Sequence, residues 1–159
     1  MNTNLFLWLL LMVLPEIVFS QSDFTIQDVK FESQGVTIVG SILKPKKPFA
    51  AVVIVHGSDP VKREMEFAKR FAKEGIAVLT YDKRGVGESG GVYVGPSVGT
   101  NNIDTTNLNL LSFDVSSAAN TFRTYLKDKK TPIGLVGFSQ AGWIIPITAN
   151  KNPQIEFMV

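Results

Sequence analysis

The apolar positions at the start of the chain alternate with polar ones, and later they come in continuous blocks. Residues 24–32 alternate with one slip, and a second run over residues 36–43 follows Gln34-Gly35. This pattern is typical of half-buried strands, so we expect an antiparallel hairpin. Prolines interrupt the polar residues 44–48, which predicts a connection out of the hairpin.

Three largely apolar blocks follow, at residues 51–55, 76–80 and 133–136, and the first of them is wholly apolar. Strands that are covered by helices on both faces have this composition. A last apolar stretch, residues 155–159, is expected to begin another strand. Strands that alternate with amphipathic helices predict an α/β fold, with a mainly parallel sheet, helices on both faces and the antiparallel hairpin in front. The sequence shows no internal repeat and no second domain.

Apolar residues at helical spacing predict helices between these blocks. The first covers residues 65–72, and we expect Asp59-Pro60 to open it. The second is expected over residues 111–125, as about four turns that follow a long loop rich in Gly and Asn. A third is expected to continue over residues 144–149.

The first residues differ in character from the rest of the chain. Residues 5–14 form an unbroken apolar run that is too short to span a bilayer, and residues 18–20 (VFS) suit a cleavage site. We expect a signal peptide over residues 1–20, cleavage before Gln21, and one domain over residues 21–159. The mature protein would be secreted or periplasmic, without stable membrane association. An N-terminal membrane anchor is the alternative.

The composition limits the possible partners and cofactors. At 159 residues, 45% hydrophobic and 19% charged, the chain fits one globular domain. A net charge of +2, without a basic cluster among aromatics, argues against a nucleic-acid partner. The absence of cysteine excludes disulfides, thiolate zinc sites and a cysteine nucleophile. One histidine and scattered carboxylates offer no ligand cluster, so we expect no metal and no cofactor.

Three short motifs follow the three apolar blocks. Residues 56–58 (HGS) come after the first block, residues 81–89 (YDKRGVGES) after the second and residues 137–142 (GFSQAG) after the third. The last motif is typical of a buried strand that delivers a serine, Ser139, to a sharp strand-to-helix turn where its hydroxyl is exposed. Such a turn requires small neighbours, and these would be Gly137, Ala141 and Gly142.

Together the motifs resemble those of the α/β-hydrolase family: an H-G pair, a D-x-R-G-x-G-x-S turn and a G-x-S-x-G nucleophile turn, with Ala141 at the last glycine. The resemblance covers roughly residues 52–142. It implies a serine hydrolase that acts on carboxylic esters by an acyl-enzyme mechanism, with Ser139 as nucleophile and a small acyl compound as substrate. It also implies that the backbone N–H groups of Ser58 and Gln140 form an oxyanion hole.

His56 is the only histidine in the sequence, so it has to be considered as the base for Ser139. The family takes its base from a loop after the last strand, and the resemblance therefore implies that His56 and Gly57 shape the oxyanion loop. The family's triad order is serine, acid, histidine, and neither partner follows Ser139 before Val159. We therefore expect the N-terminal part of a truncated α/β-hydrolase fold, inactive alone.

Other residues near the motifs have simpler interpretations. Asp82 and Arg84 predict an ion pair that stabilises their own turn, and Asp114 is expected to be a solvated surface charge. Phe138 and Trp143 are expected to pack around the serine turn, although Phe138 could line a pocket. Two further functions stay open: a peptidase of the same fold, and a catalytically inactive binding module.

Overall fold

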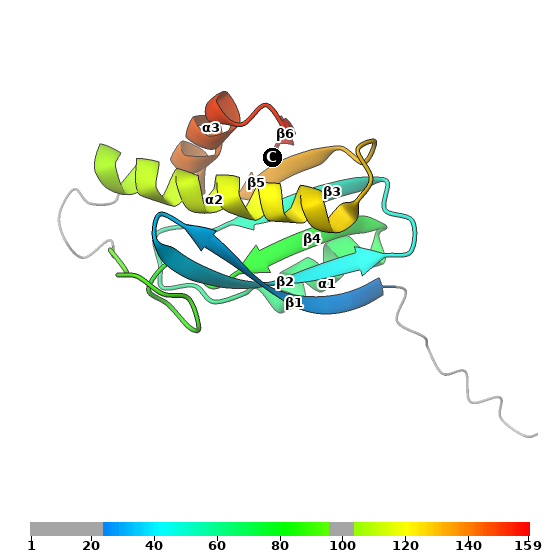
Figure 1. The fold of residues 1–159 in the computed structure, drawn as a ribbon, viewed down its shortest axis with the longest axis horizontal. Helices are drawn as coiled ribbons and strands as arrows, with labels where there is room; N and C mark the ends of the chain where they lie inside the picture. The colour runs from blue at the N-terminus through cyan, green and yellow to red at the C-terminus, as the bar shows by residue number, and fades with distance from the viewer. Residues whose placement is uncertain (1–23, 96–103) are drawn as a thin grey trace, which may run out of the picture.

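The structure, a computed structural model, describes residues 24–95 and 104–159. The described strands form a six-stranded sheet in the order β1-β2-β4-β3-β5-β6. The strands are β1 (Phe24–Ser33), β2 (Val36–Pro45), β3 (Ala50–Val55), β4 (Ile76–Tyr81), β5 (Ile133–Gly137) and β6 (Ile155–Met158). Helix α1 (Met65–Lys73) covers one face of the sheet, and α2 (Thr105–Leu126) and α3 (Ala141–Lys151) cover the other (Figure 1). The predicted α/β fold, a truncated α/β-hydrolase fold, is confirmed.

The hairpin at the start of the sheet is antiparallel, as predicted, and has a two-residue turn. Gln34 and Gly35 have φ values of 47° and 76°, and two positive values are characteristic of a type I′ turn. Strand β2 also pairs antiparallel with β4, whereas β3, β4, β5 and β6 run parallel. Because β2 lies inside the sheet, it is buried over most of its length, and the prediction of a half-buried strand was wrong for it.

The central strand β3 shows why the apolar blocks are continuous. Its residues Ala51, Val53 and Val55 join the core that includes α2 and α3. The alternate residues Val52 and Ile54 join the core beneath α1. Since side chains alternate between the two faces of a strand, coverage of both faces explains why every position of β3 is apolar.

Helix α1 begins later than the sequence predicted, because Asp59-Pro60 does not open it. Its N-terminal residues are held from the neighbouring strand instead: the backbone N–H of Glu64 donates to Thr80 Oγ1 at 2.9 Å. A free N–H group at a helix start needs an acceptor from any source. Here a contact in the tertiary structure supplies that acceptor in place of a local cap.

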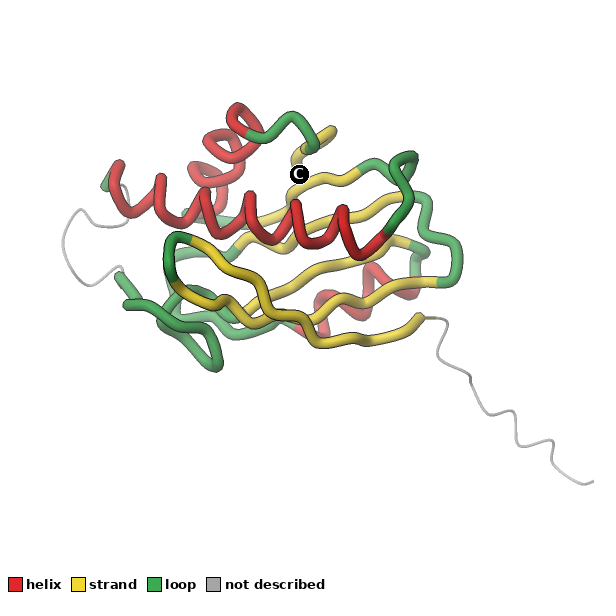
Figure 2. Tube along the Cα trace, in the orientation of Figure 1, coloured by secondary structure: helices red, strands yellow, loops and turns green. Residues whose placement is uncertain are grey.

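Helix α2 is longer than predicted, with 22 residues or about six turns, and it runs along one face of the sheet (Figure 2). The side chain of Asp104 caps its start by accepting a hydrogen bond from the N–H of Asn107 at 3.0 Å. The first turns carry Thr and Asn, which interrupt the helical spacing of apolar residues, so the prediction began too late. The helix ends before Lys127, whose φ of 56° is left-handed.

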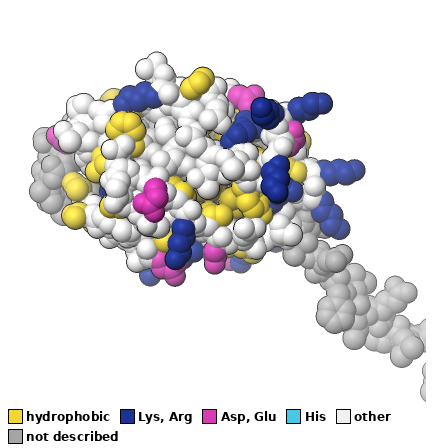
Figure 3. All heavy atoms as spheres, in the orientation of Figure 1, with side chains coloured by type: hydrophobic (Ala, Val, Ile, Leu, Met, Phe, Trp, Pro, Cys, Tyr) yellow, Lys and Arg dark blue, Asp and Glu magenta, His cyan; other side chains and the backbone are white. Residues whose placement is uncertain are grey.

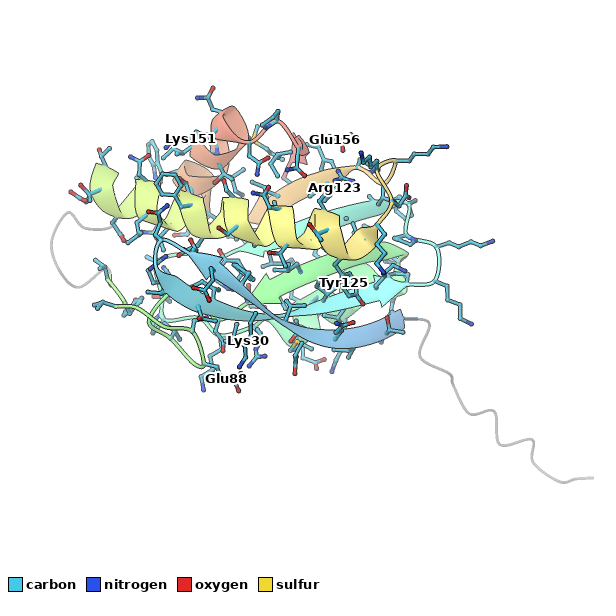
Figure 4. The ribbon with its side chains drawn as sticks, viewed as in Figure 1. Lys30, Glu88, Arg123, Tyr125, Lys151 and Glu156 are labelled. Atoms are coloured by element: carbon cyan, nitrogen blue, oxygen red, sulfur yellow. The ribbon has the colours of Figure 1, made fainter. Side chains whose placement is uncertain are left out.

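The last predicted strand is present as β6, and it pairs parallel with β5. Arg123 of α2 lies beside Glu156 of β6 (Figure 4), with Nη2 and Oε1 3.2 Å apart, so the helix is tied to this strand. The signal peptide predicted over residues 1–20 lies outside the described residues. In the described part of the chain, no helix has the length and apolar character that a membrane crossing requires.

Candidate active site

Ser139 lies in the sharp turn between β5 and α3. Its φ of 60° is left-handed, a conformation that costs a residue with a Cβ about 1–2 kcal/mol. The preceding strand is buried, whereas Ser139 itself is exposed. The turn therefore presents the serine hydroxyl at the surface, at the carboxyl end of a central parallel strand.

The two glycines beside this turn differ in what surrounds them. A Cβ at Gly137 would overlap the carbonyl oxygen of Val55 and would lie 2.5 Å from Cβ of Ala141, so this position has no room for a side chain. A Cβ at Gly142 would meet no atom within 4 Å. The expectation that Gly142 must be small was therefore wrong, because its Cβ direction leads into open space.

The sheet brings the H-G-S segment against the serine turn. Strands β3 and β5 are neighbours, with Val55 opposite Gly137, so the residues that follow each strand meet. A Cβ at Gly57 would lie 3.5 Å from Cβ of Ser139 and 4.0 Å from its Oγ. The segment that includes Ser58 therefore begins beside the serine hydroxyl.

His56 is directed away from that hydroxyl. It is only 3% exposed, and its Nε2 lies 2.5 Å from the backbone carbonyl of Tyr81, which requires the proton to be on Nε2. Among the described residues Nδ1 has no hydrogen-bond partner, and it lies 3.7 Å from Oε2 of Glu64, whose pKa the neighbouring histidine lowers. Neither ring nitrogen is thus offered to Ser139.

A buried lysine, Lys83, is a component of the site that the sequence analysis missed. It is 3% exposed, and its Nζ donates to the carbonyl of Gly57 at 2.5 Å and to Oε1 of Gln140 at 3.1 Å. Its ammonium also lies 5.6 Å from the ring centroid of Tyr93. Burial lowers the pKa of Lys83 to about 8, although the charge of Asp59 opposes this effect. The available signal was a lysine inside the turn that follows a buried strand.

The acidic and basic residues of the same turn do not pair with each other, contrary to the prediction. Asp82 accepts hydrogen bonds from the N–H groups of Arg63 and Glu88, at 2.8 and 2.9 Å. Arg84 instead binds Asp114 of α2, which is 1% exposed and not the surface charge predicted. The turn directs the side chains of Asp82 and Arg84 to opposite sides, so each of them finds a partner in another segment of the chain.

The aromatic residues of the serine turn are mostly exposed, contrary to the first expectation, and Phe138 lines a pocket, which the sequence analysis had left open. Phe138 and Trp143 are 70% and 61% exposed. For Trp143 the reason is that the buried face of α3 consists of other residues. The ring centroid of Phe138 lies 6.1 Å from that of Phe67 in α1. Phe138 thereby lines an open pocket of about 610 Å³, together with six residues that lie in α1 or directly before it: Arg63, Glu64, Met65, Glu66, Phe67 and Arg70.

Basic side chains gather at the other end of the sheet. Residues 44–48 precede β3 and residues 127–130 precede β5, so both segments lie at the amino ends of parallel strands. Figure 3 shows Lys and Arg side chains at that end of the visible face. Among the described residues, no cluster of His, Cys, Asp or Glu side chains is suited to hold a metal ion.

The fold and the order of its motifs along the sheet define an α/β hydrolase. The family model described as serine aminopeptidase, S33 (Hydrolase_4), matches residues 46–159, and the chain belongs to this family. No curated protein sequence matches the chain.

Solved structures share the fold. Acetyl xylan esterase 1 from Thermoanaerobacterium sp. JW/SL YS485 is 21% identical with a TM-score of 0.70, over 89% of this chain and 49% of that one. The α/β hydrolase GrgF from Penicillium sp. sh18 is 22% identical with a TM-score of 0.65, over 84% and 44%. The Pyrococcus furiosus esterase Pf2001 is 20% identical with a TM-score of 0.64, over 84% and 50%. The chain thus spans about half the length of these structures.

Proposed function

We propose that this chain carries the nucleophile and the oxyanion hole of a serine hydrolase that acts on carboxylic esters. The observation that carries the proposal is Ser139: an exposed serine with a φ of 60°, at the end of a buried parallel strand, beside Gly57. A strained, exposed residue held by a buried scaffold is typical of a functional site. Ser139 is the proposed nucleophile.

In the proposed reaction, Ser139 Oγ attacks the acyl carbon while a base removes the hydroxyl proton. The carbonyl oxygen becomes an oxyanion that accepts hydrogen bonds from the backbone N–H groups of Ser58 and Gln140. Gln140 directly precedes α3, so the helix dipole also favours negative charge there. As the tetrahedral intermediate collapses, the bond to the leaving oxygen breaks and the base returns its proton to that oxygen, which releases the alcohol and leaves an acyl-enzyme. Water, deprotonated by the same base, then attacks the acyl carbon, which releases the carboxylic acid and restores the Ser139 hydroxyl.

The base is not His56 in this proposal, because its Nε2 is bonded to Tyr81 and its Nδ1 faces Glu64. We propose that the triad acid and histidine belong to a part of the protein outside these 159 residues, since the matched structures are about twice as long. The chain by itself is then expected to show no ester turnover above that of Ser139→Ala. Loss of triad partners typically costs several orders of magnitude in rate.

A peptidase is the second candidate, and the description of the matching family model favours it. Peptide and ester cleavage share the nucleophile and the oxyanion hole, so the present residues support either. A protein that contains this chain with its triad completed would discriminate the two: we expect it to hydrolyse p-nitrophenyl esters and to leave aminoacyl p-nitroanilides uncleaved. Cleavage of the aminoacyl p-nitroanilides that Ser139→Ala abolishes would assign a peptidase.

The nucleophile can be tested on the 159-residue chain by supplying the missing base. We expect a fluorophosphonate probe to label Ser139, at a rate that rises with the concentration of added imidazole. Peptide mapping by mass spectrometry identifies the modified residue. Ser139→Ala should abolish the adduct, and Ser117→Ala, a change within α2, should leave it intact. An adduct at another serine, or none at any imidazole concentration, would support the inactive binding module instead.

A further inference from the structure

We infer that Lys83 is a positioning residue that sets the direction of the oxyanion-hole N–H groups of Ser58 and Gln140. One buried ammonium binds both segments that carry these groups, through the carbonyl of Gly57 and the side chain of Gln140. The inference rests on the proposed function, because it concerns how the proposed oxyanion hole is held. Lys83 itself touches no reacting atom in this role.

The first contact acts through the peptide bond between Gly57 and Ser58. The carbonyl of Gly57 and the N–H of Ser58 belong to one planar unit, and in a trans peptide they point in opposite directions. A hydrogen bond from Lys83 to this carbonyl, at 2.5 Å, therefore fixes the direction of the N–H as well. A charged donor on the carbonyl also polarises the peptide and strengthens its N–H as a donor.

The next peptide unit is held by the same segment of the chain. Tyr93 Oη donates to the carbonyl of Ser58 at 2.7 Å, and the ring of Tyr93 also lies over the ammonium of Lys83. Both peptide units that flank Ser58 are thus bonded to side chains of the segment that follows β4. A rotation of either unit would break one of these hydrogen bonds.

The second contact holds the serine turn itself. Lys83 Nζ donates to Oε1 of Gln140, a residue that is 3% exposed and directly follows Ser139. In the sheet, β3 lies between β4 and β5, so Lys83 at the end of β4 reaches across β3 to the turn after β5. The lysine therefore fixes the relative positions of two backbone donors that belong to different strands.

The charge of Lys83 fits a site where negative charge develops. Its contacts are two neutral carbonyl oxygens and an aromatic ring, and among the described residues no carboxylate forms an ion pair with it. Burial lowers the pKa of Lys83, and the charge of Asp59 opposes this effect. Tyr93 is the other titratable group beside the lysine. A buried cation without an anionic partner favours a transition state that carries an oxyanion nearby.

The test compares Lys83→Met, which retains the aliphatic stem, with Lys83→Arg, which retains the charge, in the imidazole-assisted labelling of Ser139. Removal of an oxyanion donor costs about 100- to 1,000-fold in rate, and we expect the loss of a residue that positions such donors to cost about 10- to 100-fold. Lys62→Met, at an exposed lysine in the loop before α1, is the matched control and should label at the wild-type rate. Lys83→Arg should retain more of the rate than Lys83→Met.

Two further readouts separate this role from a merely structural one. The ratio of the wild-type rate to the Lys83→Met rate should fall as the pH rises above about 8, where the ammonium loses its charge. In ¹⁵N–¹H spectra, the backbone amides of Ser58 and Gln140 should shift in Lys83→Met but not in Lys62→Met. In the wild type, the signals of the same two amides should shift with pH, with a midpoint near pH 8, as Lys83 loses its proton.

The outcomes are distinguishable from a failure of the proposed function. If the wild type is never labelled at Ser139, the proposed nucleophile is wrong, and the amide signals of Ser58 and Gln140 still test the role of Lys83. Equal labelling of wild type and Lys83→Met, with unmoved amide signals, would overturn the inference. If Lys83→Met does not fold, Lys83→Arg decides, because the larger guanidinium changes both hydrogen bonds: unmoved amide signals of Ser58 and Gln140 in that variant overturn the inference.

Discussion

Arg84 and Asp114 form a buried ion pair with two hydrogen bonds, which joins the turn after β4 to the middle of α2. Nε donates to Oδ2 at 3.0 Å and Nη2 donates to Oδ1 at 2.5 Å. Nη2 also donates to the carbonyl of Ser33 at 2.9 Å, so the guanidinium reaches the end of β1. This pair connects the hairpin, the turn that contains Lys83 and the long helix.

Removal of either partner should destabilise the fold strongly. We expect Arg84→Ala and Asp114→Ala each to lower the free energy of unfolding by about 3–5 kcal/mol, because the remaining charge stays buried without a partner. Urea denaturation measures this. Lys69→Ala, which breaks the exposed pair with Glu66, is the control and should leave the free energy of unfolding nearly unchanged. A loss below about 1 kcal/mol for Asp114→Ala would contradict the prediction.

The backbone strain at Ser139 should be measurable as stability. We expect Ser139→Gly to be more stable than Ser139→Ala by about 1 kcal/mol, because only glycine adopts a φ of 60° without a steric penalty. Thermal or urea unfolding of the two variants gives the difference. The same pair of substitutions at Ser117, inside α2, should show the opposite sign, since glycine costs a helix about 1 kcal/mol relative to alanine. Equal stabilities at position 139 would mean that the turn is not strained.

The two glycines near the serine turn should respond oppositely to alanine. Gly137→Ala would place a methyl group against the carbonyl of Val55 and against Ala141, and we expect a loss of about 1–3 kcal/mol in unfolding free energy. Gly142→Ala has open space within α3 and should be neutral or stabilising by up to about 1 kcal/mol. Chemical denaturation of the two variants decides. A destabilised Gly142→Ala would show an unforeseen contact at that position.

The lowered pKa of Lys83 predicts a specific pH dependence of stability. Burial lowers its pKa in the folded chain from the ordinary 10.5 to about 8, so between these values the unfolded chain binds more protons. The free energy of unfolding of the wild type should therefore rise from pH 8 to pH 9.5, relative to Lys83→Met. This range stays below pH 10, where buried Tyr81, with its raised pKa, begins to act in the opposite direction. A difference between the two proteins that does not vary with pH would contradict the prediction.

Export remains a prediction from the sequence. Because residues 5–14 are too few to span a bilayer and residues 18–20 suit a signal peptidase, the mature chain should begin at Gln21. Mass spectrometry of the exported protein would show this N-terminus. Recovery of the chain in the membrane fraction with Met1 retained would support the anchor instead.

The sequence by itself determined the elements and their class. The continuous apolar blocks of the central strands report burial on both faces, which depends only on local side-chain chemistry. Gln34-Gly35 encodes its turn in the same local way, through a glycine that adopts positive φ. The strand-to-helix position of Ser139 was also predictable, since an apolar strand, small residues and a following helix are all adjacent in the chain.

Only the tertiary structure decided the partners of the buried charges. Lys83 meets Gly57 and Gln140 because β3 lies between β4 and β5, and Arg84 meets Asp114 because α2 packs across the same sheet. These contacts join residues far apart in the chain, and local periodicity carries no information about strand order. The same reason explains why a buried lysine at the site and a buried aspartate in α2 resemble surface charges in the sequence.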